Sequence, residues 1–169
     1  MKVIILPGYS AHNKEWAKSI CANLGSGHIC IVHEWGHWIG GSFSLKNEVD
    51  NIMEEIGGDK VNIIAKSVGT RVTMNLIPKI INRLDKVILC GIPTKFESEP
   101  VRTLYRDNLK KLGSQNVICI QNTRDPFSPF ARVKEFVNSV DAKIKVIEKP
   151  RTDHEYPYYE DFKAFLAPK

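Results

Sequence analysis

The chain has 169 residues, of which 43% are hydrophobic and 25% are charged, and its formal net charge is +5. This composition excludes a disordered chain and a fibrous repeat. Lysines and arginines are scattered and never exceed two in a row, which argues against a nucleic-acid partner. We expect a single domain over residues 1–169.

Two features bear on the compartment of the protein. Residues 1–10 have a short apolar run that ends at Pro7, too short for a signal-peptide core or a membrane span. We therefore expect a cytoplasmic protein with no membrane partner. The cysteines lack C-x-x-C spacing, and three of them lie in apolar, strand-like runs, so we expect neither a disulfide nor a thiolate metal site. They are Cys21, Cys30, Cys90 and Cys119.

Apolar runs and helical patterns alternate along the chain. In order, the predicted elements are a strand at 2–6, a helix at 13–24, a strand at 28–32, a helix at 45–56, a strand at 61–65, a helix at 70–81, a strand at 86–90, a helix at about 101–112, a strand at 116–121, a helix at 130–140, a strand at 143–147 and a helix at 158–166. The pattern predicts an α/β fold, a three-layer αβα sandwich around a mostly parallel six-stranded sheet. Functional loops then follow the carboxyl ends of the strands.

The loop after the first strand reads Pro7-Gly8-Tyr9-Ser10. A glycine here lets the backbone come close to a ligand. The Tyr9 N–H is our first candidate for one donor of an oxyanion hole, and the Ser10 N–H is the second. A simple turn explains these residues as well.

Residues 33–37 read H-E-W-G-H and fit the H-E-x-x-H pattern of zinc proteases. That pattern works only on a helix, where both histidines share one face. A strand precedes the motif, Gly36 lies inside it and Gly40-Gly41 follow it, so we expect neither a helix nor a metal site here.

The same stretch leaves the second strand at the edge of the sheet where the functional loops meet. Trp35, His37 and Trp38 are therefore candidates for the wall of an acyl or alcohol pocket, since aromatic side chains offer a large apolar area. Packing of Trp35 and Trp38 under a long loop fits the sequence about equally well.

A strand, a tight turn and a helix meet at residues 65–69, AKSVG. In the G-x-S-x-G nucleophile elbow the positions two before and two after the serine are crowded and must be small. Ala65 and Gly69 meet this demand around Ser67. Because a helix follows at once, the Val68 N–H and the helix dipole would lie beside the serine Oγ, where an oxyanion forms. The alternative is a serine that only caps a helix.

Two further strand ends carry suitable partners for this serine. Asp125 lies in the turn after the fifth strand, and His154 follows the sixth. The order Ser67, Asp125, His154 is the Ser…Asp/Glu…His order of the α/β-hydrolases. The chemistry needs all three, because a base must take the serine proton and a carboxylate must fix the tautomer of that base.

With these motifs the chain resembles a small α/β-hydrolase, similar to the compact serine hydrolases of the retinoblastoma-binding type. The resemblance runs from the loop at 7–10 to Asp153-His154. It implies the sheet order second, first, third, fourth, fifth, sixth, without the antiparallel strands that often precede the first. Two residues depart from the family pattern: Ala65 replaces a glycine, and Lys66 stands where histidine is common.

Larger α/β-hydrolases insert a cap between the fourth and fifth strands, but residues 92–115 give only 24 residues here. That is enough for one helix and excludes a separate cap domain. We expect a shallow cleft over Ser67. The candidate substrate-binding residues are Gly8, Ser10, Trp35, His37, Trp38 and Phe127.

The sequence thus predicts a cofactor-free serine hydrolase that cleaves a carboxylic ester, or a related acyl bond such as a thioester or amide, of a small molecule. Ser67 would attack, His154 would carry the proton, Asp125 would orient His154, and the amides of Val68 and Tyr9 would hold the oxyanion. The main alternative is a catalytically idle binding protein of the same fold. A metal-dependent peptidase is a distant third.

Overall fold

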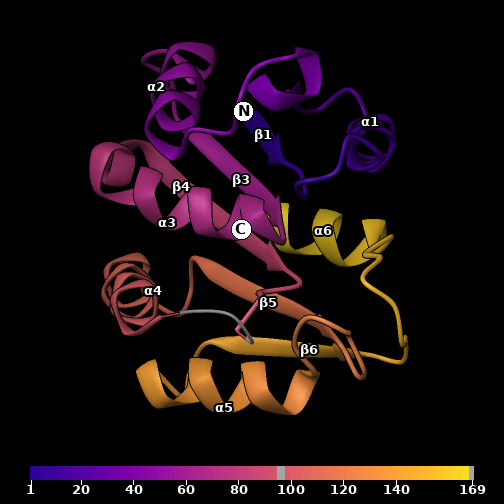
Figure 1. Cartoon of the computed structure of the whole chain (residues 1–169), viewed down its shortest axis with the longest axis vertical. Helices are drawn as coiled ribbons and strands as arrows, with labels where there is room; N and C mark the ends of the chain where they lie inside the picture. Colours follow the sequence, from indigo (N-terminus) through magenta and orange to yellow (C-terminus); the bar gives the residue numbers. More distant parts are fainter. Residues whose placement is uncertain (95–97, 168–169) are drawn as a thin grey trace.

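The computed structural model describes residues 1–94 and 98–167. Strands and helices alternate along this part of the chain (Figure 1). The strands are β1 (Lys2–Leu6), β2 (Ile29–Val32), β3 (Val61–Lys66), β4 (Leu84–Cys90), β5 (Val117–Asn122) and β6 (Lys145–Lys149). The helices are α1 (Asn13–Leu24), α2 (Leu45–Ile56), α3 (Val68–Ile80), α4 (Glu99–Leu112), α5 (Phe130–Val140) and α6 (Tyr159–Leu166), with short 3-10 turns η1 (Gly36–Ile39) and η2 (Ile81–Arg83).

The strands form one six-stranded sheet in the order β2-β1-β3-β4-β5-β6. Every neighbouring pair is parallel. This confirms the predicted sandwich and the predicted strand order. Because the strands run the same way, their carboxyl ends lie at one edge, and the loops that follow β1, β3, β4, β5 and β6 meet there.

Helices cover both faces of the sheet, as the continuous apolar strands require. Side chains alternate between the faces: Val3 and Ile5 pack with α1 and α6, whereas Ile4 and Leu6 pack with the other helices. Figure 1 shows α2, α3, α4 and α5 along one side of the sheet and α1 and α6 along the other. Within the described residues, no helix is long and apolar enough to cross a bilayer.

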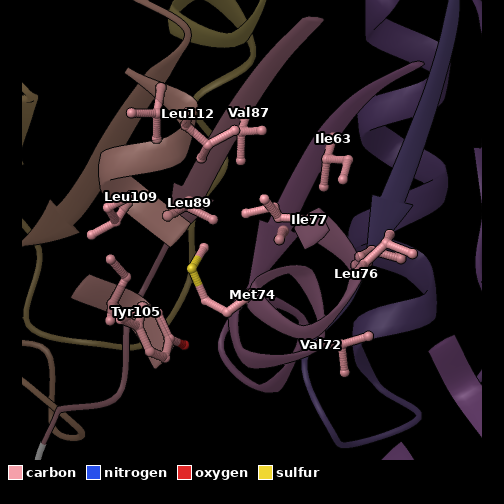
Figure 2. Packing of buried hydrophobic residues seen from close by; sticks show 14 of the residues in the cluster. Ile63, Val72, Met74, Leu76, Ile77, Val87, Leu89, Tyr105, Leu109 and Leu112 are labelled. Atoms are coloured by element: carbon pink, nitrogen blue, oxygen red, sulfur yellow. The ribbon is translucent and has the colours of Figure 1, made fainter. Parts of the chain in front are cut away.

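Helix α3 is fixed on the sheet by buried aliphatic side chains. Met74 and Ile77 lie against Ile63 of β3 and Leu89 of β4, and all four are fully buried (Figure 2). Burial of one such side chain contributes roughly 1.5 to 3 kcal/mol. This packing also fixes the turn that precedes α3.

Several predicted boundaries shift by one or two residues, and the starts of α3 and β6 are examples. Helix α3 begins at Val68, directly after the serine, rather than at residue 70. Strand β6 begins at Lys145 rather than at residue 143. Here Asp141 accepts hydrogen bonds from the Lys143 N–H on its side chain (2.9 Å) and from the Ile144 N–H on its carbonyl (3.1 Å), so these residues form a turn.

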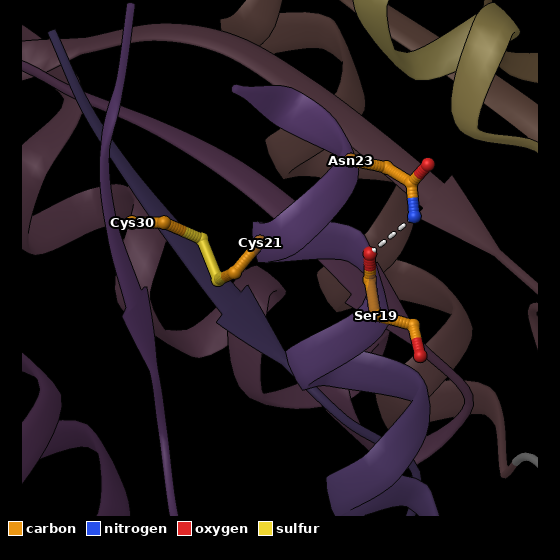
Figure 3. The surroundings of a disulfide bond; sticks show 4 residues. All are labelled: Ser19, Cys21, Asn23 and Cys30. Carbon is orange, nitrogen blue, oxygen red and sulfur yellow. Dashed lines mark hydrogen bonds between the residues drawn. A yellow bond between two sulfur atoms is a disulfide. The ribbon is translucent and has the colours of Figure 1, made fainter. Parts of the chain in front are cut away.

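The expectation of no disulfide is wrong. Cys21 of α1 and Cys30 of β2 are bonded, with their Cα atoms 5.6 Å apart (Figure 3). The sequence gives no warning because the pair is brought together by the packing of α1 against β2 and not by a short spacing. Cys90 and Cys119 are free and buried, in agreement with their predicted role as small hydrophobic residues.

The disulfide closes a short loop, so its loss should lower the free energy of unfolding by about 2 to 3 kcal/mol. We expect dithiothreitol to destabilise the wild type by this amount, as measured by urea unfolding. The variant Cys21→Ser should show the same loss and no further response to dithiothreitol. A wild-type free energy of unfolding that does not change with dithiothreitol would contradict the disulfide.

Candidate active site

Ser67 lies on a strained turn between β3 and α3. Its backbone has φ 54° and ψ −118°, and no other non-glycine residue in the described part of the chain has a positive φ. The Ser67 N–H donates to the Cys90 carbonyl of β4 (3.0 Å), and the Ser67 carbonyl accepts from the N–H and the hydroxyl of Thr70 (2.9 and 2.6 Å). Such conformations cost of order 1–3 kcal/mol and persist where neighbouring groups hold them.

Gly69 lets α3 approach the end of β1. A Cβ at this position would lie 2.1 Å from the Leu6 carbonyl oxygen and 2.9 Å from that of Pro7. The structure therefore explains why this position of the turn must be small. Ala65 is fully buried in β3, between Leu6 of β1 and Leu89 of β4.

Asp125 and His154 form a hydrogen-bonded pair. The His154 Nδ1 lies 2.6 Å from Asp125 Oδ2. Asp125 is only 3% exposed, and its other oxygen accepts the N–H groups of Phe127 (2.8 Å) and Ser128 (3.3 Å). The carboxylate is thus held rigidly and aimed at one nitrogen of the imidazole.

Tyr156 is a member of this cluster that the sequence analysis missed. Its hydroxyl donates to Asp125 Oδ2, the oxygen that also contacts His154, and its side chain is fully buried. The only signal for Tyr156 in the sequence is its position two residues after His154. Burial, together with the charge of Asp125, raises the pKa of Tyr156, so the phenol remains a donor.

Two opposing effects set the pKa of Asp125. Burial alone would raise it, but the hydrogen bonds from His154 and Tyr156 outweigh burial and hold the pKa below the ordinary aspartate value. Asp125 is therefore an anion at neutral pH. Such a charge fixes the Nδ1–H tautomer of His154.

The second ring nitrogen of His154 is not used by Asp125. His154 Nε2 is buried and has no hydrogen-bond partner within the described residues. The ring lies over Gly91, where a Cβ would be 2.7 Å from His154 Cε1. Gly91 follows Cys90, whose carbonyl binds the Ser67 N–H. The end of β4 thus contacts Ser67 through Cys90 and His154 through Gly91, and His154 in turn contacts Asp125.

The loop after β1 is anchored by the stretch at 33–44. Tyr9 is 53% exposed, and its carbonyl accepts from Trp38 Nε1 and lies 2.7 Å from His37 Nε2. The Tyr9 ring stacks on His37 with centroids 4.1 Å apart. The Gly8 carbonyl accepts from Trp35 Nε1 (3.1 Å). Contacts from a neighbouring loop therefore fix the backbone of Gly8 and Tyr9.

Trp35 does not line an open pocket, which corrects the prediction for this residue. Its side chain has no exposed surface and belongs to the main core, so the alternative of packing under the loop applies. Phe127 is 42% exposed, and its ring centroid lies 4.5 Å from that of His154. Its ring lies beside the imidazole, and its role in binding a substrate stays a prediction.

The zinc-protease pattern at 33–37 is not on an α-helix. His33 is buried, with Nε2 3.0 Å from Glu48 and Nδ1 2.9 Å from Glu55, whereas His37 contacts Tyr9. A 3-10 turn begins only at Gly36. As the sequence predicted, the residues do not form the helical face that this zinc site needs.

No protein-family model matches the sequence, and no curated protein matches it. Solved structures do. The meta-cleavage product hydrolase CumD of Pseudomonas fluorescens IP01 has a TM-score of 0.70 and 14% identity over 98% of this chain and 88% of its own. XC6422 of Xanthomonas campestris, an α/β serine hydrolase without a lid, has a TM-score of 0.67 and 12% identity over 96% of this chain and 77% of its own.

The ydeN gene product of B. subtilis has a TM-score of 0.66 and 16% identity, and the match covers 98% of both chains. At these identities the likeness concerns the fold. The chain has the α/β-hydrolase fold without a lid.

We expect Gly69→Ala to destabilise the protein by at least about 4 kcal/mol, because the added methyl group would push α3 away from the Leu6 carbonyl. Gly58→Ala is the control: nothing lies within 4 Å of its Cβ position, and the change should stay within about 0.5 kcal/mol. Urea unfolding measures both. Equal stabilities would show that the turn tolerates a larger residue.

Asp125 should also make stability depend on acidity. Because its pKa is lowered by folding, its contribution is present above the unfolded value of about 3.9 and is lost as the pH falls through the folded value. We expect the free energy of unfolding to fall between pH 5 and pH 3, and to fall less in Asp125→Asn. An equal fall in the wild type and in Asp125→Asn, measured by urea unfolding at the two pH values, would refute this.

Proposed function

We propose that this protein is a serine hydrolase that cleaves a carboxylic ester, or a related acyl bond, of a small molecule. One observation supports this most strongly: a serine on a strained turn and a buried Asp125–His154 pair share the end of β4. The unpartnered Nε2 of His154 is the atom that would take the serine proton. No cofactor is needed for this chemistry.

In the proposed reaction Ser67 Oγ attacks the carbonyl carbon while His154 Nε2 takes its proton. The N–H groups of Val68 and Tyr9 would stabilise the oxyanion. Collapse of the tetrahedral intermediate expels the alcohol, which receives the proton from His154, and leaves an acyl-enzyme on Ser67. Water, deprotonated by the same histidine, then releases the carboxylic acid and restores the serine.

A catalytically idle binding protein of this fold is the rival. Two features favour the hydrolase. A binding protein has no use for the strained backbone at Ser67. It also has no use for a buried carboxylate that orients a histidine whose second ring nitrogen has no hydrogen-bond partner among the described residues. The similar lidless protein from Xanthomonas is described as a serine hydrolase, which supports the same choice.

The acid partner is Asp125 rather than the neighbouring Asp153 in this proposal. Asp153 Oδ1 accepts from Arg151 Nε at 2.9 Å, and its side chain is 47% exposed. The Arg151 hydrogen bond keeps its pKa low, but the pair lies at the surface. Of these two carboxylates, only Asp125 is bonded to the imidazole of His154.

The predicted cytoplasmic location remains a prediction. The Cys21–Cys30 disulfide counts against it, since disulfides are rare where the compartment keeps thiols reduced.

A fluorophosphonate probe tests the proposal directly. It should label the wild type at Ser67, and Ser67→Ala should lose both labelling and ester turnover, by at least on the order of a thousandfold. The fold should remain intact, which circular dichroism checks. Full activity in this variant would sink the proposal.

Matched pairs assign the other roles. His154→Ala should be nearly inactive, whereas His37→Ala should retain most of its activity if His37 only anchors Tyr9. Asp125→Asn should cost far more turnover than Asp153→Asn. If either pair behaves in reverse, the base or the acid lies elsewhere.

We expect substrate length to be limited by the shallow cleft that the sequence predicts over Ser67. In this proposal the Tyr9 loop, Trp38 and Phe127 would cover a short acyl chain but not a long one. Each buried methylene contributes roughly 0.8 kcal/mol, so kcat/KM should rise over the first few carbons of a nitrophenyl ester series and then level off. A steady rise to long chains would show a closed tunnel.

A further inference from the structure

Lys66, the residue before the serine, carries a buried charge. Its side chain is 1% exposed, and its Nζ donates to Asn13 Oδ1 (2.7 Å) and Glu155 Oε2 (3.0 Å). The ammonium also lies over the Trp16 ring, 5.5 Å from the centroid. Lysine is almost never buried unless it is paired, so these partners are what keep the charge inside the protein.

Asn13 connects this charge to the loop after β1. It is the first residue of α1, and its Nδ2 donates to the Ser10 carbonyl at 3.0 Å. Its side chain also packs on Gly8, where a Cβ would lie 2.8 Å from Asn13 Nδ2. Lys66 therefore reaches the backbone on both sides of Tyr9 through one amide side chain.

Glu155 and Trp16 connect the same charge to the loop after β6. Glu155 directly follows His154, and its carbonyl accepts from Asn122 Nδ2 at 2.8 Å. Trp16 Nε1 donates to the Tyr156 carbonyl at 2.9 Å. Glu155 thus bonds to Lys66 directly, and the Tyr156 carbonyl is held by Trp16, whose ring lies beside the Lys66 ammonium.

We propose that Lys66 is a positioning residue that fixes the loop at 8–10 and the loop at 154–156 in position relative to Ser67. This rests on the proposed serine hydrolase function, since it concerns the relative positions of the oxyanion donor, the nucleophile and the base. In a fold without a lid, no inserted domain packs on these loops and fixes them. The Lys66 ammonium is bonded to Glu155 directly and to the loop at 8–10 through Asn13, and a hydrogen bond is strong in this buried position.

Stability alone does not explain a lysine at this position. Replacement of a buried ion pair by apolar residues of similar size is often neutral or stabilising. A misplacement of about 1 Å in an active site, by contrast, can cost a hundredfold in rate. We therefore expect loss of the Lys66 charge to lower the rate of turnover more than the free energy of unfolding.

The test compares two buried lysines. Lys66→Met keeps an unbranched side chain, one atom shorter, and removes its charge. Lys86→Met is the matched control: Lys86 is 9% exposed, lies near the start of β4 and therefore far from the carboxyl-end loops, donates to the Ala167 carbonyl (2.7 Å) and faces the Phe165 ring. Both variants are assayed for kcat and KM on a short nitrophenyl ester, for fluorophosphonate labelling rate and for melting temperature.

For Lys66→Met we expect kcat and the labelling rate to fall about ten- to a hundredfold while KM changes by no more than about twofold, because donor and base geometry matters most in the transition state. Lys86→Met should keep kcat within about twofold whatever its melting temperature. Asn13→Ala should lower kcat in the same sense. The losses in the double variant Lys66→Met/Asn13→Ala should be less than additive, because both changes break the connection from Lys66 to the loop at 8–10.

An unchanged kcat in folded Lys66→Met, or additive losses in the double variant, would overturn the positioning role. If Lys66→Met does not fold, Glu155→Gln and Asn13→Ala decide the question by the same kcat and KM measurements, and normal kcat in both overturns it. These failures differ from failure of the proposed function, in which the wild type itself would show no labelling at Ser67.

Discussion

The close approach of α3 to the end of β1 is the constraint on which the site depends. Gly69 lets the helix touch the Leu6 carbonyl, and the helix then begins directly after Ser67, which forces the serine into its positive φ. The hydrogen bond from Ser67 to Cys90 ties that turn to β4. The core residues of α3 supply the stability that holds this strained backbone in place.

Charge is distributed around this turn in two buried clusters. In one, Asp125 is surrounded by donors from His154, Tyr156 and the backbone, which stabilise its anion and orient the imidazole. In the other, Lys66 bridges Asn13 and Glu155 beneath the loops. Both clusters follow the rule that a buried charge needs complete pairing. Each connects segments that are far apart in the sequence.

The stretch at 33–44 shows how one motif can mislead. Its H-E-x-x-H letters suggest a metal site, yet His33 binds two glutamates and the indole of Trp35 holds the Gly8 carbonyl. Here the aromatic residues serve as supports for the loop after β1. The disulfide between α1 and β2 lies next to this region in the sheet, on the strand from which the stretch emerges.

The sequence by itself determined the alternating strands and helices and the three strand ends that carry Ser67, Asp125 and His154, because apolar periodicity and turn residues are local signals. The strand order was implied only by the resemblance to the α/β-hydrolases. Tertiary structure alone decided the rest. The Cys21–Cys30 bond, the Tyr156 hydroxyl on Asp125, the burial of Trp35 and the pairing of Lys66 all join residues from separate elements. Such contacts depend on how helices pack on the sheet, and no spacing along the chain encodes that packing directly.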